Sequence, residues 1–340
     1  MSLSSVRGIP FARVDAVTFS RILCPVDFSE HSQRALQLAA LLARSFESQL
    51  ALLHVNYPVL VATSAIVHAE RAEEDTRADL NRLLDNVLAD DRGGARDVTV
   101  LVTEGDPSEQ IASVAEEHGV DLIVMGTHGP GGFRTKLIGS TTKRVLRRTT
   151  IPVAAVPLGD STFSLEDSLR PGSGSLVAAI DFSEPSRHAA RTAAGVATEL
   201  GLGLVLLHVL KPMRTVLRWR EQAAARDKSR MTEAREQLDA LAVALQPVTV
   251  AEILIVTGHP ADDIAATAIQ RKASLIAMGL GGDEGLFAPS PGSIAYRTLC
   301  LAPMPVLAIP ALKDPSAARQ RLRAATHGGS PNMPRSSSSA

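Results

Sequence analysis

Cysteine is scarce in this sequence of 340 residues, which contains only Cys24 and Cys300. Two cysteines in apolar surroundings exclude a disulfide framework and a thiolate zinc cage, and they fit a reducing compartment. An excess of one charge is also lacking, because 35 Lys and Arg residues oppose 36 Asp and Glu residues. This balance argues against a nucleic-acid-binding surface that works by neutralising phosphates.

Long apolar runs are missing as well. The longest, Leu299 to Leu312, is interrupted by three prolines and is too short to cross about 30 Å of hydrocarbon. Residues 1–19 have no apolar run of signal-peptide length and are expected to form a flexible leader. Residues 312–340 are largely Ser, Pro and Gly rich and are expected to be mostly disordered. We therefore expect a cytoplasmic protein with no membrane contact.

What the sequence does contain is an internal duplication. Cys24–Glu30 (CPVDFSE) corresponds to Ala178–Glu184 (AAIDFSE), and Leu52–Val55 corresponds to Leu206–Val209, both LLHV, each pair 154 positions apart. Later blocks correspond at a spacing of 153. A repeat of this length predicts two copies of one structural unit. The expected domains are residues 20–158 and 176–311, joined by a polar, flexible linker at residues 159–175.

Within each copy, short apolar runs alternate with helical patterns, which predicts an α/β fold with a parallel sheet covered by helices on both faces. The last strand of each copy would otherwise expose an unpaired edge. We therefore expect Val153–Val156 and Val306–Ile309 to pair across a pseudo-twofold axis, so that one chain forms a pseudo-dimer. The other strands expected in the first copy are Arg21–Val26, Gln49–Val55, Asp97–Thr103 and Leu122–Gly126.

A glycine-rich loop follows the fourth expected strand and leads into a helix. Its pattern is Gly, two residues, Gly, nine residues, Gly and Ser, and it recurs from Gly279 to Ser293. Such loops expose backbone N–H groups next to a helix N-terminus, which together bind anions. A phosphate chain is the expected ligand, and Arg134 and Lys136 could approach it.

The glycine spacing, the DFSE segments after the first strand and the LLHV strands resemble the universal stress protein family in its tandem form. The resemblance covers nearly all of both copies. It implies two tandem Rossmann-like domains of the adenine nucleotide alpha hydrolase type, each with five parallel strands in the order 3-2-1-4-5. It also implies an adenine nucleotide, ATP with or without Mg²⁺, across strands one and four, a regulatory role in the stress response through an unidentified protein partner, and a homodimer.

The resemblance also implies roles for single residues. Asp27 and Val55 would contact adenosine, and Ser140 and Thr141 would meet the phosphates. The other positions assigned to the nucleotide site are Pro25, Val26, Met125, Gly126, His128, Gly129, Gly132, Arg134 and Gly139 in the first copy, and Ala179, Asp181, Val209, Met278, Gly279, Gly282, Gly292, Ser293 and Ile294 in the second.

Some of these residues also have purely structural interpretations. Asp27 and Asp181 could be turn or capping aspartates, and Ser140 and Ser293 could cap the helices that follow them. Capping is compatible with phosphate contact, because both use the same N–H groups. The histidines in the two LLHV strands are expected to be satisfied core residues rather than ligands.

Catalytic motifs are lacking, since the sequence has no Walker A loop, no Gly-x-Ser-x-Gly elbow and no nucleophile with an obvious base. We therefore expect binding without catalytic residues or a dedicated metal site. A slow Mg²⁺-dependent ATPase and a nucleotide-free interaction scaffold are the alternatives. Because Asp283 and Glu284 replace the cations of the first loop, we expect tighter ATP binding in the first copy.

Overall fold

The structure is a computed structural model of the chain. The described residues are 19–56, 65–88, 97–128, 137–158, 164–212, 220–245, 248, 250–281 and 293–311. Residues 1–18 of the predicted leader, the predicted tail beyond residue 311 and most of both glycine-rich loops lie outside these ranges. Phe19, the last residue of the predicted leader, is instead buried in the core.

The strands of the first half are close to those expected from the apolar runs, and the second half repeats them. The strands are β1 (Arg21–Pro25), β2 (Gln49–Asn56), β3 (Val98–Glu104), β4 (Leu122–Gly126), β5 (Val153–Val156), β6 (Ser175–Ala179), β7 (Gly203–Leu210), β8 (Val250–Thr257), β9 (Ala273–Leu280) and β10 (Val306–Pro310).

Helices connect these strands in the alternating pattern that the sequence predicts. The helices are α1 (Glu30–Ser45), α2 (Ala65–Leu88), α3 (Pro107–Glu117), α4 (Ser140–Arg148), α5 (Leu165–Ser168), α6 (Glu184–Glu199), α7 (Arg220–Ala244), α8 (Pro260–Gln270) and α9 (Ile294–Leu301). Among the described residues, no helix combines the length and the apolar character needed to cross a membrane.

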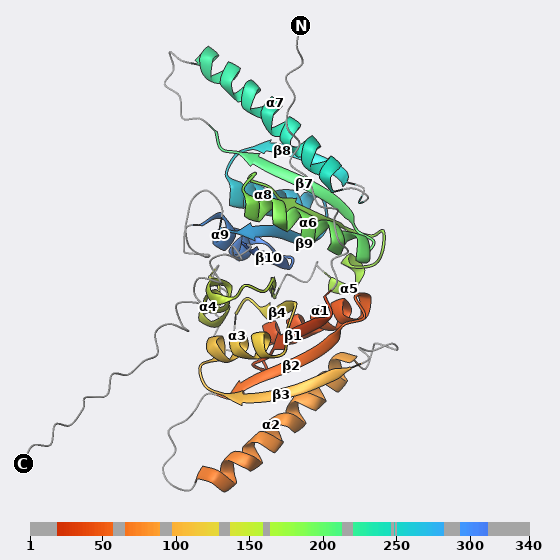
Figure 1. Cartoon of the computed structure of the whole chain (residues 1–340), viewed down its shortest axis with the longest axis vertical. Helices are drawn as coiled ribbons and strands as arrows, with labels where there is room; N and C mark the ends of the chain where they lie inside the picture. Colours follow the sequence, from red (N-terminus) through yellow and green to blue (C-terminus); the bar gives the residue numbers. More distant parts are fainter. Residues whose placement is uncertain are drawn as a thin grey trace, which may run out of the picture.

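The described strands form one ten-stranded sheet in the order β3-β2-β1-β4-β5-β10-β9-β6-β7-β8 (Figure 1). Each half therefore has the order 3-2-1-4-5, which confirms the expected fold. Neighbours within a half are parallel, whereas β5 and β10 are antiparallel, with Leu307 opposite Ala154. This pairing confirms the expected pseudo-dimer and closes the edge strand of each half.

The hydrophobic core consists of two clusters, one on each face of the sheet. Buried residues of α1, α2, α5, α6 and α7 form one cluster, and those of α3, α4, α8 and α9 form the other. Successive strand residues alternate between the clusters, as Ile22 and Leu23 do, because side chains of a strand point to opposite faces. Both clusters contain residues of both halves, so the core runs through the whole sheet.

Helices α4 and α9 also meet across the junction between the halves. The Lys143 ammonium lies over the Tyr296 ring, 5.7 Å from its centroid. Burial raises the pKa of the Cys300 thiol, while its interactions with the Ile138 backbone and the Tyr296 side chain act in the opposite direction. The segment that leads into α4 is therefore in contact with the second half.

The predicted linker is more ordered than its polar composition indicates. It contains the short helix α5, whose first residue, Leu165, is buried together with Leu169 in the cluster that also covers α1 and α6. Ser164 caps this helix by accepting a hydrogen bond from the Asp167 backbone N–H at 3.2 Å. Two apolar residues among polar ones are thus enough to dock part of the connection onto the core.

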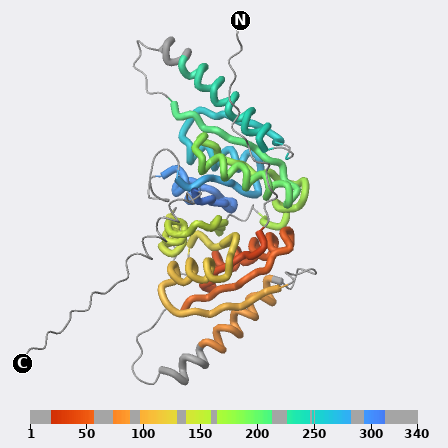
Figure 2. Tube along the Cα trace, in the orientation of Figure 1, coloured from red at the N-terminus to blue at the C-terminus, as the bar shows by residue number. Residues whose placement is uncertain are grey.

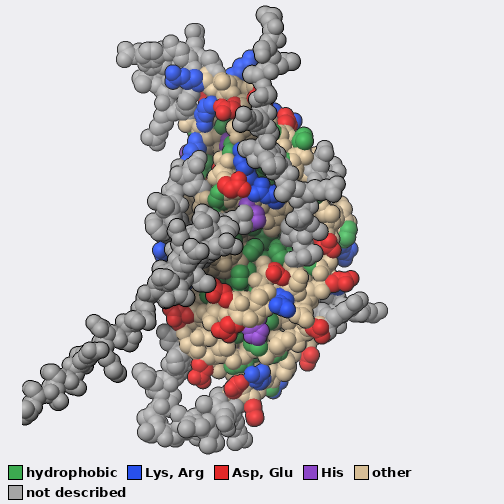
Figure 3. Space-filling view, viewed as in Figure 1, with side chains coloured by type: hydrophobic (Ala, Val, Ile, Leu, Met, Phe, Trp, Pro, Cys, Tyr) green, Lys and Arg blue, Asp and Glu red, His purple; other side chains and the backbone are tan. Residues whose placement is uncertain are grey.

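The two halves lie along the long axis, with α2 and α7 at its opposite ends (Figures 1 and 2). On the face shown in Figure 3, described acidic and basic side chains are interspersed. This distribution matches the near-zero net charge of the sequence.

Candidate nucleotide-binding site

The predicted site residues of the first half that the structure describes lie at the carboxyl ends of β1, β2 and β4 and at the start of α4. Strand β1 lies between β2 and β4, and the chain leaves β1 and β4 in opposite directions across the sheet. This is the topological switch point at which open α/β sheets bind ligands. Asp27 follows β1 there, and Gly126 is the last residue of β4. Strands β6 and β9 make the same arrangement in the second half.

The aspartates after β1 and β6 form identical turns. Oδ1 of Asp27 accepts a hydrogen bond from the Ser29 backbone N–H at 3.1 Å and another from the Ser29 hydroxyl. Asp181 makes the same contacts with Ser183. The turn interpretation of these aspartates is therefore confirmed, and Ser29 and Ser183, rather than the aspartates, are the N-caps of α1 and α6.

Each of these turns contains a phenylalanine in the left-handed region of backbone space. Phe28 has φ +62° and Phe182 has φ +65°, which is rare for a bulky residue and costs free energy. The Phe28 ring lies against His54, with ring centroids 4.9 Å apart, and Phe182 lies against His208 at 4.5 Å. The same strained conformation thus occurs at the switch point of both halves.

The two strand histidines are satisfied by the backbone, as expected for core residues. Nδ1–H of His54 donates to the Val26 carbonyl at 2.8 Å, and that of His208 donates to the Ile180 carbonyl at 2.6 Å. Burial lowers the pKa of His208. These bonds fix the end of β1 and β6 against the neighbouring strand.

Gly126 and Gly279 allow the first turns of α1 and α6, respectively, to approach the sheet. A Cβ at Gly126 would lie 2.9 Å from backbone and side-chain carbons of His31, and one at Gly279 would lie 2.5 Å from the Pro185 carbonyl carbon. No side chain fits in either space. The first glycine of the repeated motif is therefore required for the packing of α1 and α6 on the sheet.

Two hydrogen bonds tie the start of α4 to the end of β4. The Gly139 N–H donates to the Thr127 carbonyl at 2.7 Å, and the Thr142 hydroxyl donates to the Gly126 carbonyl at 2.8 Å. Gly139 is the N-cap of α4 and offers no side-chain capping bond. The prediction that Ser140 caps this helix is therefore wrong, since Ser140 is already helical and its side chain is exposed. The N–H groups of the first turn remain available to an anion.

The start of α9 differs from that of α4. Ser293 is its N-cap and accepts a hydrogen bond from the Tyr296 N–H at 3.2 Å, which confirms the capping prediction for this residue. Ala295 occupies the position of Thr142 and has no hydroxyl. One backbone N–H of the first turn of α9 is therefore already bonded to a side chain of the protein, that of Ser293.

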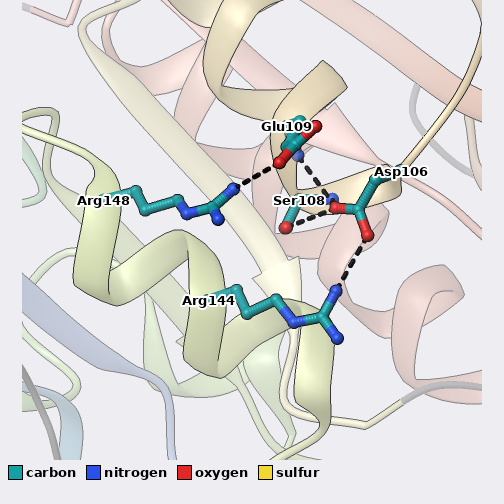
Figure 4. A network of polar contacts seen from close by, with 5 residues as sticks. All are labelled: Asp106, Ser108, Glu109, Arg144 and Arg148. Carbon is teal, nitrogen blue, oxygen red and sulfur yellow. Dashed lines mark hydrogen bonds and ion pairs between the residues drawn. The ribbon is translucent and has the colours of Figure 1, made fainter.

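Helix α4 is fixed on its other side by two ion pairs with α3 (Figure 4). Arg144 contacts Asp106 at 2.8 Å and Arg148 contacts Glu109 at 3.0 Å. Asp106 also caps α3, and the Ser108 hydroxyl, the backbone N–H groups of the first turn and Arg144 together lower its pKa. In the second half Arg297 makes a single such pair with Asp262 at 2.7 Å.

A pair of histidine rings spans the switch point of the first half. His31, in the first turn of α1, and His128, two residues beyond β4, have ring centroids 5.0 Å apart. Burial and the neighbouring His128 lower the pKa of His31, and burial lowers that of His128. The sequence predicted a role for His128 but not for His31, because their proximity depends on two loops that are far apart in the chain.

The other predicted positions also map to this edge of the sheet. Pro25, Val26 and Val55 lie at the ends of β1 and β2, Met125 is in β4, Thr141 is in α4, Ala179 and Val209 are in β6 and β7, Met278 is in β9 and Ile294 begins α9. Outside the described residues lie Gly129, Gly132, Arg134, Lys136, Gly282, Asp283, Glu284 and Gly292.

Metal-binding side chains do not converge in the described part of the chain, where no three His, Cys, Asp or Glu residues could hold an ion. A Mg²⁺ that accompanies ATP would therefore depend on the phosphates, with Asp27 as the carboxylate at the end of β1. Oδ1 of that carboxylate is already engaged by Ser29.

Comparison with known proteins gives one consistent result. A family model described as the universal stress protein family matches residues 18–157 and 174–310. Universal stress protein YxiE of Bacillus subtilis is 27% identical over 41% of this chain and 99% of its own length. Universal stress protein MJ0577 of Methanocaldococcus jannaschii is 28% identical over 42% of this chain and 96% of its own length.

Each of these two relatives therefore matches about one half of the chain. Among solved structures, a universal stress protein from Archaeoglobus fulgidus superposes with a TM-score of 0.60 at 20% identity, over 85% of this chain and 96% of that one. This likeness extends across both halves and supports the tandem fold.

Proposed function

The chain belongs to the universal stress protein family, and on this basis we propose that it is a cytoplasmic, ATP-binding regulatory module of the stress response. ATP binding would change its conformation or its contacts with a protein partner. The boundaries of the two domains, at residues 20–158 and 176–311, are part of this proposal.

The observation that carries the proposal is the construction of the α4 N-terminus. It lies beside the end of β4 at the switch point, is held there by the Thr127 and Thr142 bonds, and has no side-chain cap. Uncapped N–H groups in a fixed position bind phosphate oxygens through hydrogen bonds and the helix dipole. The glycine motif that leads into this helix is the one by which the sequence resembles ATP-binding members of the family.

We further propose that the first half binds ATP more tightly than the second. In the second half Ser293 uses one N–H of the α9 cradle, and Ala295 cannot make the bond that Thr142 makes. The two glycine-rich loops also differ in charge, because the first carries Arg134 and Lys136 and the second carries Asp283 and Glu284. Carboxylates near a triphosphate weaken its binding.

Hydrolysis of ATP, where it occurs, would be slow, because the described site offers hydrogen-bond donors and no base paired with a water-activating group.

Homodimerisation through surfaces away from the β5–β10 junction is also proposed, and light scattering of the full chain tests it. A mass of one chain at all concentrations would exclude the homodimer.

The site is tested by adding a charge at Ser140, which is exposed at the first position of α4. Ser140→Asp places a carboxylate where it favours the helix dipole but repels a triphosphate, so the fold is retained while ATP binding weakens by about tenfold or more. Ser140→Asn is the neutral control. Isothermal titration of the full chain with ATP, with a phosphate-release assay in parallel, measures both binding and turnover.

Equal ATP affinities of the Ser140→Asp and Ser140→Asn proteins would contradict the proposed site. Rapid phosphate release by the unmodified chain that is lost in Ser140→Asp would indicate an ATPase instead. Absence of ATP binding by the unmodified chain would favour the alternative that the protein is a nucleotide-free interaction scaffold.

A further inference from the structure

The start of α4 is held by both halves of the chain. Within the first half, the Gly139 N–H donates to the Thr127 carbonyl at 2.7 Å. Toward the second half, the Ile138 backbone interacts with the Cys300 thiol of α9. Ile138 is buried and is the last residue before the N-cap of α4. The residue that leads into the uncapped N–H groups of α4 is therefore also a contact of α9.

A second contact joins the same two helices about one turn further along α4. The Lys143 ammonium lies over the Tyr296 ring, 5.7 Å from its centroid, and the buried Tyr296 side chain in turn interacts with Cys300. These contacts leave the start of α4, pass through α9 and return to α4. We call them the junction contacts, and they are made by Ile138, Cys300, Tyr296 and Lys143.

The junction contacts lie where the two copies of the duplication meet. Lys143 and Tyr296 are 153 positions apart, as are Ser140 and Ser293 at the starts of α4 and α9, so each pair occupies equivalent positions in the two copies. In a twofold arrangement, equivalent positions touch each other only at the axis. The N-termini of α4 and α9 are therefore linked across the pseudo-twofold axis, through a contact that neither half makes alone.

The side chains around these contacts belong to one packed cluster. Ile138 and Val145 of the first half share it with Tyr296 and Leu299 of the second. Close-packed interiors transmit small displacements and restrictions from one side chain to the next. A ligand bound by the N–H groups of the first turn of α4 restricts that turn and the residue before it. The restriction then extends to the side chains of α9 that are in contact with them.

We propose that the junction contacts couple ATP binding at α4 to the second half, so that an occupied first-half site restricts the movement of α9. The inference rests on the proposed ATP site and adds to it a route by which occupancy reaches the other half of the chain. The glycine motif does not identify this route, because none of the four residues belongs to the pattern.

Cys300 provides a natural reporter of α9. The chain has only two cysteines, of which Cys24 is completely buried and Cys300 is half-buried. The rate at which an aromatic disulfide reagent labels the folded full chain therefore measures local opening around Cys300. At ATP concentrations that saturate the chain in a titration, labelling should slow by about fivefold or more, the lower end of ordinary coupling between sites. A Cys300→Ser chain identifies the thiol that reacts.

Two variants show which half holds the ATP that causes the effect. Ser140→Asp places a carboxylate at the start of α4, and Ser293→Asp places one at the start of α9, where aspartate is also a good N-cap. Slower labelling in the presence of ATP should be lost in Ser140→Asp and retained in Ser293→Asp. Slower labelling that is lost in Ser293→Asp and retained in Ser140→Asp overturns the proposal, because ATP in the second half would then protect Cys300 directly.

Three variants test the route itself. Lys143→Met removes the ammonium from the Tyr296 ring and should still bind ATP, but most of the effect of ATP on labelling should be lost. Lys143→Arg keeps a cation over the ring and should retain the effect. Arg147→Met, which removes an exposed charge from the same helix, should also retain it. An effect of equal size in Lys143→Met and Arg147→Met shows that the Lys143 contact does not carry the coupling and overturns the proposal.

The unmodified chain separates this inference from the proposed function. ATP that binds in the titration but leaves the labelling rate of Cys300 unchanged removes the inference, and the proposed function stands. Absence of ATP binding by the unmodified chain contradicts the proposed function and this inference together.

Discussion

Single glycines determine how closely the first helix of each half approaches its sheet. At Gly279 an added Cβ would meet three backbone atoms of Pro185 and Ser186 at 2.5–2.7 Å, whereas at Gly126 the nearest atoms are 2.9–3.0 Å away. Real Cβ atoms do not approach backbone so closely. Helices α6 and α1 would have to move away from buried strands, and the second half has less space to accommodate this.

We therefore expect both Gly126→Ala and Gly279→Ala to destabilise the chain, by about 1–3 kcal/mol, with the larger loss at Gly279. Urea unfolding followed by circular dichroism measures the shift in the unfolding midpoint and the loss in free energy of unfolding. Gly203→Ala is the control, because its Cβ would meet the Ala251 Cβ at an ordinary 3.4 Å. Equal midpoints for the unmodified chain and Gly279→Ala would show that the helix is not held as closely as described.

The histidine pair makes stability depend on pH. The pKa of His31 is lower in the folded chain than its ordinary value, so the unfolded chain binds more protons near pH 6. The free energy of unfolding therefore rises with pH through the range in which a free imidazole titrates, and it falls on acidification below about pH 6.5. His128 acts in the same direction.

His31→Pro should accordingly reduce the loss of thermal stability between pH 7.5 and pH 5.5. Thermal melts at a series of pH values provide the comparison. A steeper pH dependence in His31→Pro would contradict the lowered pKa of His31.

At the scale of elements, the capping of α3 matters more than the ion pairs that join it to α4. Asp106 accepts hydrogen bonds from the Ser108 and Glu109 N–H groups at 3.0 and 3.2 Å, besides its contact with Arg144. The Arg144 side chain is 55% exposed, so solvent screens the pair. The cap is local and is not screened in this way.

Asp106→Ala is therefore expected to cost about 1 kcal/mol and Asp106→Ser much less, since serine also caps helices. Arg144→Gln should cost less than about 0.5 kcal/mol. Chemical denaturation of the three variants tests this order. A loss in Arg144→Gln as large as that in Asp106→Ala would assign the stability to the ion pair instead.

At the scale of the whole molecule, the β5–β10 pairing and the shared core clusters join the two homologous halves into one folded unit. The separated first half, residues 19–158, would expose the edge of β5 and the surface of α4 that Tyr296 covers. Light scattering is expected to find it self-associated, because β5 can pair with another β5 as it does with β10. A monomer that melts at the temperature of the full chain would contradict this view of the junction.

Much of this fold follows from the duplication in the sequence. The repeated apolar runs predict the strands, and the edge argument predicts that Val153–Val156 pairs with Val306–Ile309. The helix α5 was not predicted, because its two buried leucines lie in a segment of otherwise polar composition. The start of α4 at Ser140 was also not predicted, since Gly139 and Gly292 look alike in the sequence and only the structure shows which following serine is a cap.

The site was predicted only where neighbouring residues in the chain carry the pattern. Asp27 comes just after the apolar strand β1 and Gly126 is the last residue of β4, so their position at one edge of the sheet is a consequence of parallel strands. The His31–His128 contact joins residues 97 positions apart in the numbering. That these two rings meet is therefore visible only in the structure.

The central claim is that the first half of the chain binds ATP at the N-terminus of α4, where the backbone N–H groups of the first turn have no side-chain cap. Calorimetric titration of ATP into the full chain and into Ser140→Asp and Ser293→Asp variants tests it most directly. The account predicts a tight site that is lost in Ser140→Asp and retained in Ser293→Asp. Loss of the tight site in Ser293→Asp with retention in Ser140→Asp, or no ATP binding by any of the three proteins, would contradict it.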